Sequence, residues 1–384
     1  MAINVSVFKE LTGGDALFSR GLNETGAYVV APATTRIGDP GTFGYRKLAY
    51  IVRINGIKPI PWADKIVVAQ VEGWEVVTQK GQFNVGDLAV YFEIDSVLPV
   101  SNPNMAFLEG KRLKTKMFRD QISQGLLGLM SWLPQGSTEY LEGQDVTSVL
   151  GVTKWVHPQE ASLYEDGDSK QGGWISPLIP KTDEVRVQSA TKQLERLRGK
   201  RVVITQKYDG TSATFVVING KFFVCGRNRV HTQYDNSNSH FQEIVARYSL
   251  EAKMVALGRN IALQGEIVGP KINGNRHSVS ANEFYAFNLF DLETGEYTDW
   301  ASLTAVTEAI GVKTVPLVFR GEMLETLMTV PALLAFADAE KYTNGTIAKP
   351  AEGIVVKSDF TREDKMQRVS FKVISNSYLK KYDL

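Results

Sequence analysis

The chain has 384 residues, of which 43% are hydrophobic and 22% charged, an ordinary balance for a globular protein with room for two domains. The formal net charge is +1, so a surface that binds nucleic acid has to come from local clustering of Lys and Arg. The single cysteine, Cys225, excludes an intramolecular disulfide framework. The sequence has neither a long apolar run nor a signal-peptide layout. We therefore expect an intracellular protein, in the cytoplasm or another reducing compartment, without a membrane partner.

The first part of the chain changes character at Tyr45. Residues 1–44 are rich in Gly, Thr and Ala, and we treat them as an extension whose role the sequence does not reveal. Residues 45–155 contain short alternating segments typical of β-strands, separated by Asn-Gly, Pro and Gly, with no long helical pattern between them. The strand segments are 47–54, 65–71, 74–78 and 88–94. This pattern predicts a small closed β-barrel of the OB type.

A basic run follows these strands within the same predicted barrel. It contains Lys111, Arg112, Lys114, Lys116 and Arg119. A charge run is most often a solvated face of a protein. Because this one lies on an expected OB barrel beside Phe118, we favour a surface that contacts the backbone of a nucleic acid. The segment 61–74 also resembles the opening of tRNA-binding OB modules, a likeness that covers one hairpin.

A linker is expected between the barrel and the rest of the chain. Residues 156–178 hold acidic residues, a Gly-Gly pair and proline, as linkers often do. The second domain is then expected to occupy residues 179–384. Within it, residues 194–198 predict a short helix, and residues 243–257 predict a longer one from their apolar spacing.

The second domain places a lysine, Lys207, at the end of an apolar strand. The strand segment 201–205 is followed by Gln-Lys-Tyr-Asp-Gly-Thr-Ser and then by a second strand segment, 213–218. A lysine amine attacks phosphorus only when it is neutral, and cations, a metal or a dry site lower its pKa. Because Lys-x-Asp-Gly also makes a good hairpin turn, the motif alone leaves both interpretations open.

Charged residues recur inside apolar strand segments farther along the chain. Glu266 interrupts one such segment, Glu352 and Lys357 bracket another, and Lys372 lies inside a third. A buried charge is costly unless it has a partner or a function. Together with Lys207, these four charges therefore indicate a polar site rather than an exposed surface.

In their order and chemistry, these residues resemble the motif series of ATP-dependent RNA ligases. The likeness is closest to the RNA ligase 2-like nucleotidyltransferase family, in the branch with an amino-terminal OB domain, and it covers roughly residues 45–384. The matching segments are 207–210, 226–228, 265–266, 285–287, 352–357 and 371–372. Each segment is a weak signal, whereas the joint pattern is specific.

The resemblance implies an α+β protein in which the barrel precedes a two-sheet nucleotidyltransferase domain, an ATP-grasp-like ligase fold with flanking helices. It also implies an ATP-dependent RNA ligase that joins 3′-hydroxyl and 5′-phosphate ends. The expected substrates are nicks in duplex RNA or in RNA paired with DNA. The expected intermediates are lysyl–AMP on Lys207 and an AMP-capped 5′-phosphate. We expect a monomer with no obligate protein partner.

The resemblance also assigns catalytic roles to residues of this chain. Lys207 attacks the α-phosphorus of ATP. Asp209 and Glu352 hold Mg²⁺ or Mn²⁺, directly or through water, since these ions prefer oxygen ligands. Lys357 and Lys372 neutralise the α-phosphate oxygens and, with the metal, lower the pKa of the attacking amine.

Four further roles concern nucleotide binding. Glu266, which is also a catalytic candidate, accepts hydrogen bonds from the ribose hydroxyls, and Phe287 stacks on adenine. Gln206 hydrogen-bonds the edge of the base. Arg227 contacts a phosphate or the RNA end.

The chain departs from the family pattern in two places. Its fifth motif has one lysine, Lys372, where two are common, so a second cation has to come from elsewhere, and Arg368 is the candidate. The chain also ends at Leu384, without the further OB domain that DNA ligases and capping enzymes carry there. This disfavours a DNA ligase or a capping-type guanylyltransferase. Both stay open as alternatives, together with a catalytically inactive RNA-binding protein.

Overall fold

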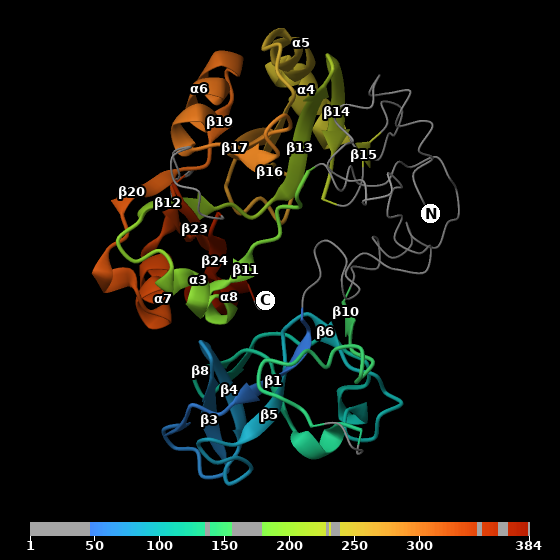
Figure 1. The fold of residues 1–384 in the computed structure, drawn as a ribbon, viewed down its shortest axis with the longest axis vertical. Helices are drawn as coiled ribbons and strands as arrows, with labels where there is room; N and C mark the ends of the chain where they lie inside the picture. The colour runs from blue at the N-terminus through green and yellow to red at the C-terminus, as the bar shows by residue number, and fades with distance from the viewer. Residues whose placement is uncertain are drawn as a thin grey trace. The chain divides into compact units, whose positions relative to one another are not determined.

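The computed structural model describes residues 47–134, 139–155, 179–227, 230–231, 239–343, 348–359 and 368–382. They form two compact units, drawn as ribbons in Figure 1. The barrel unit comprises the described residues up to 155, the segment Arg186–Lys192 and the carboxy-terminal helix. The two-sheet unit comprises the other described residues between 179 and 375. The expected extension, 1–44, and the expected linker, 156–178, lie outside the described residues.

Antiparallel strands build the barrel unit, in two three-stranded sheets and two short pairs. The first sheet has the order β1 (Ala49–Arg53), β5 (Leu88–Phe92), β9 (Leu126–Leu129). The second has the order β2 (Gly56–Pro59), β3 (Ile66–Val71), β4 (Trp74–Gln79). The pairs are β6 (Ser96–Val97) with β10 (Thr153–Lys154) and β7 (Lys116–Phe118) with β8 (Gln121–Ser123). Short helices complete the unit: η2 (Ala106–Leu108), η3 (Met130–Trp132), η4 (Val187–Ser189) and α8 (Asn376–Tyr382).

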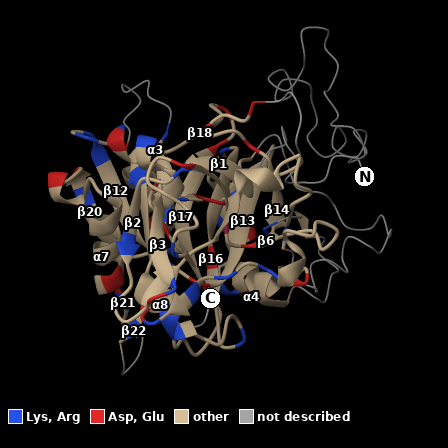
Figure 2. Cartoon of the chain, turned by 90° about the horizontal axis from the view of Figure 1, so that it is seen from below, with Lys and Arg blue, Asp and Glu red and all other residues tan. Residues whose placement is uncertain are grey.

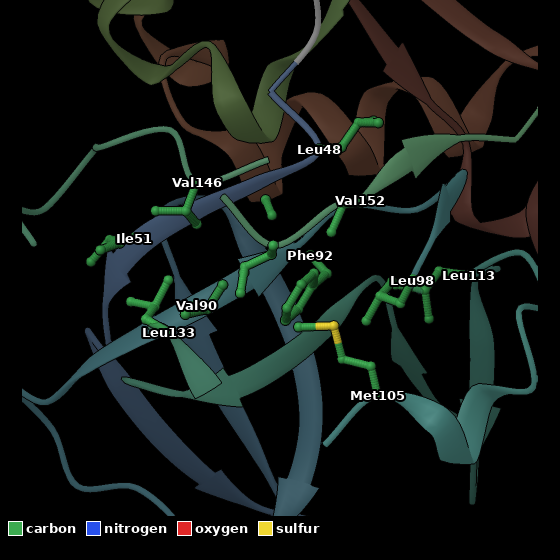
Figure 3. Packing of buried hydrophobic residues seen from close by; sticks show 12 residues of the cluster. Leu48, Ile51, Val90, Phe92, Leu98, Met105, Leu113, Leu133, Val146 and Val152 are labelled. Atoms are coloured by element: carbon green, nitrogen blue, oxygen red, sulfur yellow. The ribbon is translucent and has the colours of Figure 1, made fainter. Parts of the chain in front are cut away.

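The barrel unit buries both faces of its central strands. Ile51 and Val90 contribute to one apolar cluster, which Figure 3 shows together with Phe92. Tyr50 packs in a second cluster with Trp74. Because successive residues of a strand point to opposite faces, β1 and β5 supply both clusters. Burial on both faces explains why these strands read as nearly continuous apolar runs.

Most neighbouring strands of the two-sheet unit pair antiparallel, and β17 pairs with β19 in parallel. The five-stranded sheet has the order β11 (Val185–Arg186), β24 (Ser370–Ile374), β23 (Gly353–Ser358), β12 (Arg201–Lys207), β20 (Leu317–Glu322). The seven-stranded sheet has the order β15 (Val230–His231), β14 (Lys221–Cys225), β13 (Thr211–Ile218), β16 (Ile261–Val268), β17 (Glu283–Asp291), β18 (Glu296–Tyr297), with β19 (Lys313–Thr314) beside β17. A separate pair joins β21 (Lys341–Tyr342) to β22 (Lys349–Pro350).

Helices flank these sheets, as the α+β prediction requires. They are α3 (Thr191–Glu195), α4 (Ser239–Tyr248), α5 (Leu250–Ala256), α6 (Trp300–Ile310), η6 (Glu325–Leu327) and α7 (Val330–Ala339). Helices α5 and α6 pack on the seven-stranded sheet and α7 packs on the five-stranded sheet (Figure 1). No helix in the described part of the chain is long and apolar enough to cross a membrane.

Two helix predictions were wrong in detail. The single helix expected over residues 243–257 is two helices, because Ser249 adopts a left-handed conformation with φ of 51°, which an α-helix cannot continue. The short helix expected at 194–198 lies earlier, as α3. The chain then turns toward Gly199, whose φ is +64°.

Candidate active site

The central strands of the five-stranded sheet carry three lysines on one face. Lys207 is the last residue of β12 and pairs with Gly353 of β23. Four residues earlier on β12, Val203 pairs with Lys357 of β23. Lys372 on β24 pairs with Val355 of the same β23 strand. Directly paired residues share a face and the faces alternate along each strand, so the three lysines point to the same side of the sheet.

The Lys207 amine lies within a group of carboxylates. Its Nζ donates a hydrogen bond to Glu352 Oε2 at 2.7 Å, and both side chains are largely buried. Burial alone would lower the pKa of this amine. The surrounding carboxylates, led by Glu352 and Glu266, outweigh burial and raise the pKa above its ordinary value. The protein by itself therefore favours the ammonium form of Lys207, and positive charge placed near these carboxylates would weaken that preference.

Asp209 is held by a loop that follows β16. Asn273 Nδ2 donates to Asp209 Oδ1 at 2.7 Å, and the Arg276 guanidinium forms an ion pair with Oδ2. The Asp209 backbone N–H donates to Nε2 of His277 at 3.2 Å, and burial lowers the pKa of this histidine to about 4. Sequence reasoning missed these three loop residues, because polar residues in an Asn-Gly-Asn turn are ordinary and carry no signal of the distant carboxylate.

Glu266 faces the same site from the seven-stranded sheet. It pairs with Ser212 of β13, and its Oε1 accepts a hydrogen bond from the Gly210 N–H at 3.1 Å. Burial raises the pKa of the Glu266 carboxyl to about 8, although the Lys207 amine acts in the opposite direction. The Glu266 carboxyl and the Lys207 amine therefore influence each other's pKa across the site.

Two motif glycines are required by close backbone approach. A Cβ at Gly210 would lie 2.2 Å from the carbonyl oxygen of Ile267. At Gly353, which has a φ of +150°, a Cβ would lie 2.0 Å from the carbonyl oxygen of Val373. Any larger residue would have to push apart the strands that carry Lys207 and its partners.

The second lysine, Lys357, is buried against the middle of the aromatic strand β17. Its Nζ donates to the Phe287 carbonyl at 2.8 Å and to Asn288 Oδ1 at 2.9 Å. Burial, with a smaller contribution from the cation of Arg368, lowers the pKa of the Lys357 amine to about 7, while Glu184 acts in the opposite direction. Arg368 donates to the same Asn288 oxygen at 2.8 Å, so the candidate second cation lies beside Lys357.

The Phe287 ring is placed by a β-bulge. In the β16–β17 ladder Gln264 pairs with Asn288 and Gly265 pairs with Ala286, which leaves Phe287 without a partner residue. Such bulges re-aim a side chain next to functional sites. The ring is only partly buried, and Lys357 Nζ lies 5.3 Å from its centre.

Two of the expected nucleotide-binding residues are engaged elsewhere. The Gln206 amide donates to Glu340 Oε2 at 2.8 Å and to the Lys341 carbonyl at 3.0 Å, and the strand register places it on the opposite face from Lys207. Arg227 is exposed and forms an ion pair with Asp183 at 2.8 Å. The motif residue after it, at position 228, lies outside the described residues.

The basic run of the barrel unit divides into engaged and exposed members. Arg112 donates to Asp95 at 2.7 Å and stacks on the Trp155 ring, 4.4 Å from its centre. Lys111 pairs with Glu109 at the surface. Lys114 and Lys116 are also exposed. Figure 2 shows Lys and Arg interspersed with Asp and Glu along the ribbon.

Exposed aromatic rings accompany this run, and sequence reasoning did not single out the largest one. Trp62 is 91% exposed in the loop between β2 and β3, and Phe118 is 40% exposed on β7. The Arg119 guanidinium donates to the Trp62 carbonyl, which ties the β7–β8 turn to this loop. We call Lys114, Lys116, Arg119, Trp62 and Phe118 the hairpin surface.

The donor set of the site fits a metal that is shared with a substrate. Asp209 and Glu352 offer carboxylate oxygens, the ligand type that Mg²⁺ and Mn²⁺ prefer. Among the described residues, no group of three or more His, Cys, Asp or Glu could hold a metal ion. Mg²⁺ is ordinarily bound by one or two carboxylates, water and substrate phosphates, and these residues suit that mode.

Comparisons with known proteins agree with this architecture. Residues 200–374 match the family model described as RNA ligase, and residues 48–130 match a model of an OB-fold domain. No curated protein matches the chain significantly.

Solved structures of a Naegleria gruberi RNA ligase are similar to both units. The structure with PPi is 33% identical, with a TM-score of 0.74, and covers 88% of this chain and 99% of that chain. A variant with ATP and Mn is 33% identical, with a TM-score of 0.76 and coverage of 88% and 100%. A variant with AMP and Mn is 32% identical, with a TM-score of 0.75 and coverage of 88% and 99%. The chain belongs to the RNA ligase family, as a member with an amino-terminal OB-fold domain.

Proposed function

We propose that this chain is an ATP-dependent RNA ligase that joins 3′-hydroxyl and 5′-phosphate ends at nicks in duplexes of RNA or RNA paired with DNA. The observation that carries the proposal is the Lys207 amine, 2.7 Å from Glu352 and on the same sheet face as Lys357 and Lys372. The similar Naegleria gruberi structures contain ATP, AMP and Mn, which supports the same nucleotide and metal here.

In the first step the neutral Lys207 amine attacks the α-phosphorus of ATP. A nitrogen–phosphorus bond forms, the bond from the α-phosphorus to its bridging oxygen breaks, pyrophosphate leaves and the amine loses a proton. Lys357 and Lys372, with Arg368 as a further cation, neutralise charge on the phosphate oxygens. A divalent metal held by Asp209 and Glu352 would add positive charge that offsets the carboxylates around Lys207.

The next two steps use the lysyl–AMP. A 5′-phosphate oxygen of the RNA attacks the AMP phosphorus, the bond to the Lys207 nitrogen breaks, and the amine regains a proton. A 3′-hydroxyl then attacks the capped 5′-phosphorus, loses its proton and releases AMP. The protein contributes positioning and charge stabilisation, which dominate phosphoryl-transfer catalysis.

The nucleotide is recognised by groups around this centre. Glu266 hydrogen-bonds the ribose, and Phe287, re-aimed by its bulge, stacks on adenine. Arg227 contacts a phosphate or the RNA end, exchanging its exposed pair with Asp183 for that anion. Gln206 reaches the base edge only by giving up its contacts with Glu340 and Lys341, which makes it the most demanding of these assignments.

The barrel unit provides the RNA-binding surface in this proposal, and the two-sheet unit provides the chemistry. Exposed cations bind the phosphate backbone, and exposed rings stack on bases, as other OB-folds bind nucleic acid. In this proposal the enzyme acts as a monomer without an obligate partner protein. We place the enzyme inside the cell, where its RNA substrates occur.

One experiment separates this proposal from its alternatives. The protein is incubated with radiolabelled ATP or GTP and divalent metal, and the labelled peptide is identified by mass spectrometry. The proposal predicts AMP on the peptide containing Lys207, followed by sealing of a nick with RNA at the 3′-hydroxyl side. Transfer of GMP would indicate a capping-type enzyme, sealing of DNA alone a DNA ligase, and no adduct an inactive RNA-binding protein.

A further inference from the structure

A buried tyrosine hydroxyl connects the backbone of the two strands that carry Lys207 and Glu352. Tyr342 Oη donates a hydrogen bond to the Lys207 carbonyl oxygen at 2.8 Å. The same hydroxyl accepts a hydrogen bond from the Glu352 N–H at 3.0 Å. The side chains of Lys207 and Glu352 also contact each other, at 2.7 Å, so the hydroxyl and this ion pair join the same two residues.

The hydroxyl lies where the β-ladder stops. The last pair between β12 and β23 is Lys207 with Gly353, and Glu352 is the next residue beyond it. In a continuing antiparallel ladder, backbone N–H and C=O groups would bond directly across the strands. Here the Tyr342 hydroxyl is inserted between the N–H of one strand and the C=O of the other. The separation of the two strand ends at the catalytic residues is therefore set by a side chain.

Tyr342 is itself held firmly. It is only 3% exposed, with the His277 ring centre 4.0 Å away and the Tyr208 ring centre 5.6 Å away. The backbone carbonyl just before it, of Lys341, accepts from the Gln206 amide at 3.0 Å. A side chain packed in this way keeps one rotamer, so its hydroxyl can act as a rigid spacer.

We propose that Tyr342 is a positioning residue that sets the separation and orientation of Lys207 and Glu352 for the adenylylation step. The inference rests on the ligase function proposed above. It assigns no contact between Tyr342 and substrate. The hydroxyl acts through the backbone of the nucleophile and of the carboxylate, and small displacements of such groups have large effects on rate.

The test replaces Tyr342 with Phe, which keeps the ring packing and removes only the hydroxyl. Three quantities are measured: the single-turnover rate of AMP–protein formation at saturating ATP, the dissociation constant for ATP, and the sealing of RNA that already carries the AMP cap. We expect adenylylation to slow by about tenfold or more, while ATP affinity changes by less than about threefold. Sealing of pre-adenylylated RNA should slow less, because that step makes and breaks no bond to Lys207.

The matched control is Tyr50→Phe, which removes a buried hydroxyl that also has two partners, Glu72 and Ser189, from the barrel unit. It should lower thermal stability without separating the two steps. A folded Tyr342→Phe protein that adenylylates at the wild-type rate, or slows equally in both steps, would overturn the proposal.

The remaining outcomes are also decisive. A Tyr342→Phe protein that does not fold even at low temperature would assign the hydroxyl to stability alone and overturn the proposal as well. Failure of the ligase function itself is distinguishable, because the wild-type protein would then form no AMP adduct. A crystal structure of the variant gives an independent readout: we expect the distance from Lys207 Nζ to Glu352 Oε2 to depart from 2.7 Å.

Discussion

The two units of this ligase carry their charges in opposite ways. In the two-sheet unit, Lys207, Glu352 and Lys357 are largely buried and bonded to named partners. In the barrel unit, Lys114 and Lys116 are exposed at the surface. Buried groups interact strongly and respond to one another, whereas exposed charges are screened by salt within about 10 Å. In the function proposed above, this contrast assigns the chemistry to the two-sheet unit and the reversible contact with a polyanion to the barrel unit.

This comparison predicts different kinds of mutational effect. Removing one member of the buried group should abolish or nearly abolish a specific reaction step, because its partners are left uncompensated. Removing exposed cations should weaken RNA binding gradually and in a salt-dependent way, with adenylylation unchanged.

The largest effect is expected at Lys207. Lys207→Ala should form no AMP–protein, because the nucleophile is gone, and Lys207→Arg should be equally inactive, since a guanidinium remains protonated and cannot attack. Mass spectrometry after incubation with ATP and metal measures the adduct. Covalent AMP on the alanine variant would show that another residue is the nucleophile.

A large but smaller effect is expected at the carboxylates. Glu352→Gln should slow adenylylation by about a hundredfold or more, because it removes the charge that binds metal and contacts Lys207. Asp209→Ala should be similarly impaired. Glu308→Gln, an exposed change on α6, is the control and should retain wild-type rates. Full ligation by Glu352→Gln at ordinary magnesium concentrations would remove Glu352 from the mechanism.

In the barrel unit, a variant that loses four cations of the basic run should bind RNA about tenfold to a hundredfold more weakly. The residues changed to Ala are Lys111, Lys114, Lys116 and Arg119. The slope of log affinity against log salt should flatten by up to about 3, because fewer counterions are released. AMP–protein formation should be unchanged, since it needs no RNA. Fluorescence anisotropy over a salt series measures both quantities.

The control variant loses the same number of cations elsewhere on the surface. In it, four exposed lysines are changed to Ala: Lys80, Lys192, Lys221 and Lys380. It should keep most of the affinity and the slope. If both variants seal nicks normally across the salt series, the basic run is only a solvated face.

A single change, at the exposed Trp62 ring, tests whether the barrel unit also binds RNA by stacking. Trp62→Ala should weaken RNA binding by about tenfold, the loss expected for one stacked base, with the salt slope unchanged. Trp62→Phe should restore much of the affinity, because it keeps a stacking surface. A change in slope, or no loss at all, would contradict a stacking role.

The smallest expected effect is a pH dependence set by Lys357. Its amine is charged below a pKa of about 7 and neutral above it, and bound phosphate favours the charged form. ATP affinity should therefore fall as pH rises from about 7 to about 9, by about threefold to tenfold in all. Arg368 and Glu184 are the charged groups that act on the pKa of Lys357, the first lowering it and the second raising it. Lys357→Arg should flatten the profile, since arginine remains charged.

The strands and the order of the motifs could be predicted from the sequence. Apolar runs predicted strands at 201–205 and 213–218, where β12 and β13 lie, and strand segments holding Glu266, Lys357 and Lys372, where β16, β23 and β24 lie. Period-two alternation also determines which residues share a face with their neighbours on one strand. Helices were less well predicted, because the break at Ser249 depends on a single left-handed residue that the apolar spacing does not reveal.

What the sequence determined by itself was the set of charged residues that cannot be buried without a function, together with the glycines beside them. The tertiary structure alone decided how they meet: Lys207 contacts Glu352 across 145 residues of chain, and Tyr342, 135 residues from Lys207 and 10 from Glu352, joins their backbones. It also decided that Gln206 faces away from Lys207 and that Asn273 and Arg276 hold Asp209. Local periodicity in the sequence predicts which face of its strand or helix a residue occupies. What lies opposite that face depends on strand order and loop closure, which arise only when distant segments pack together.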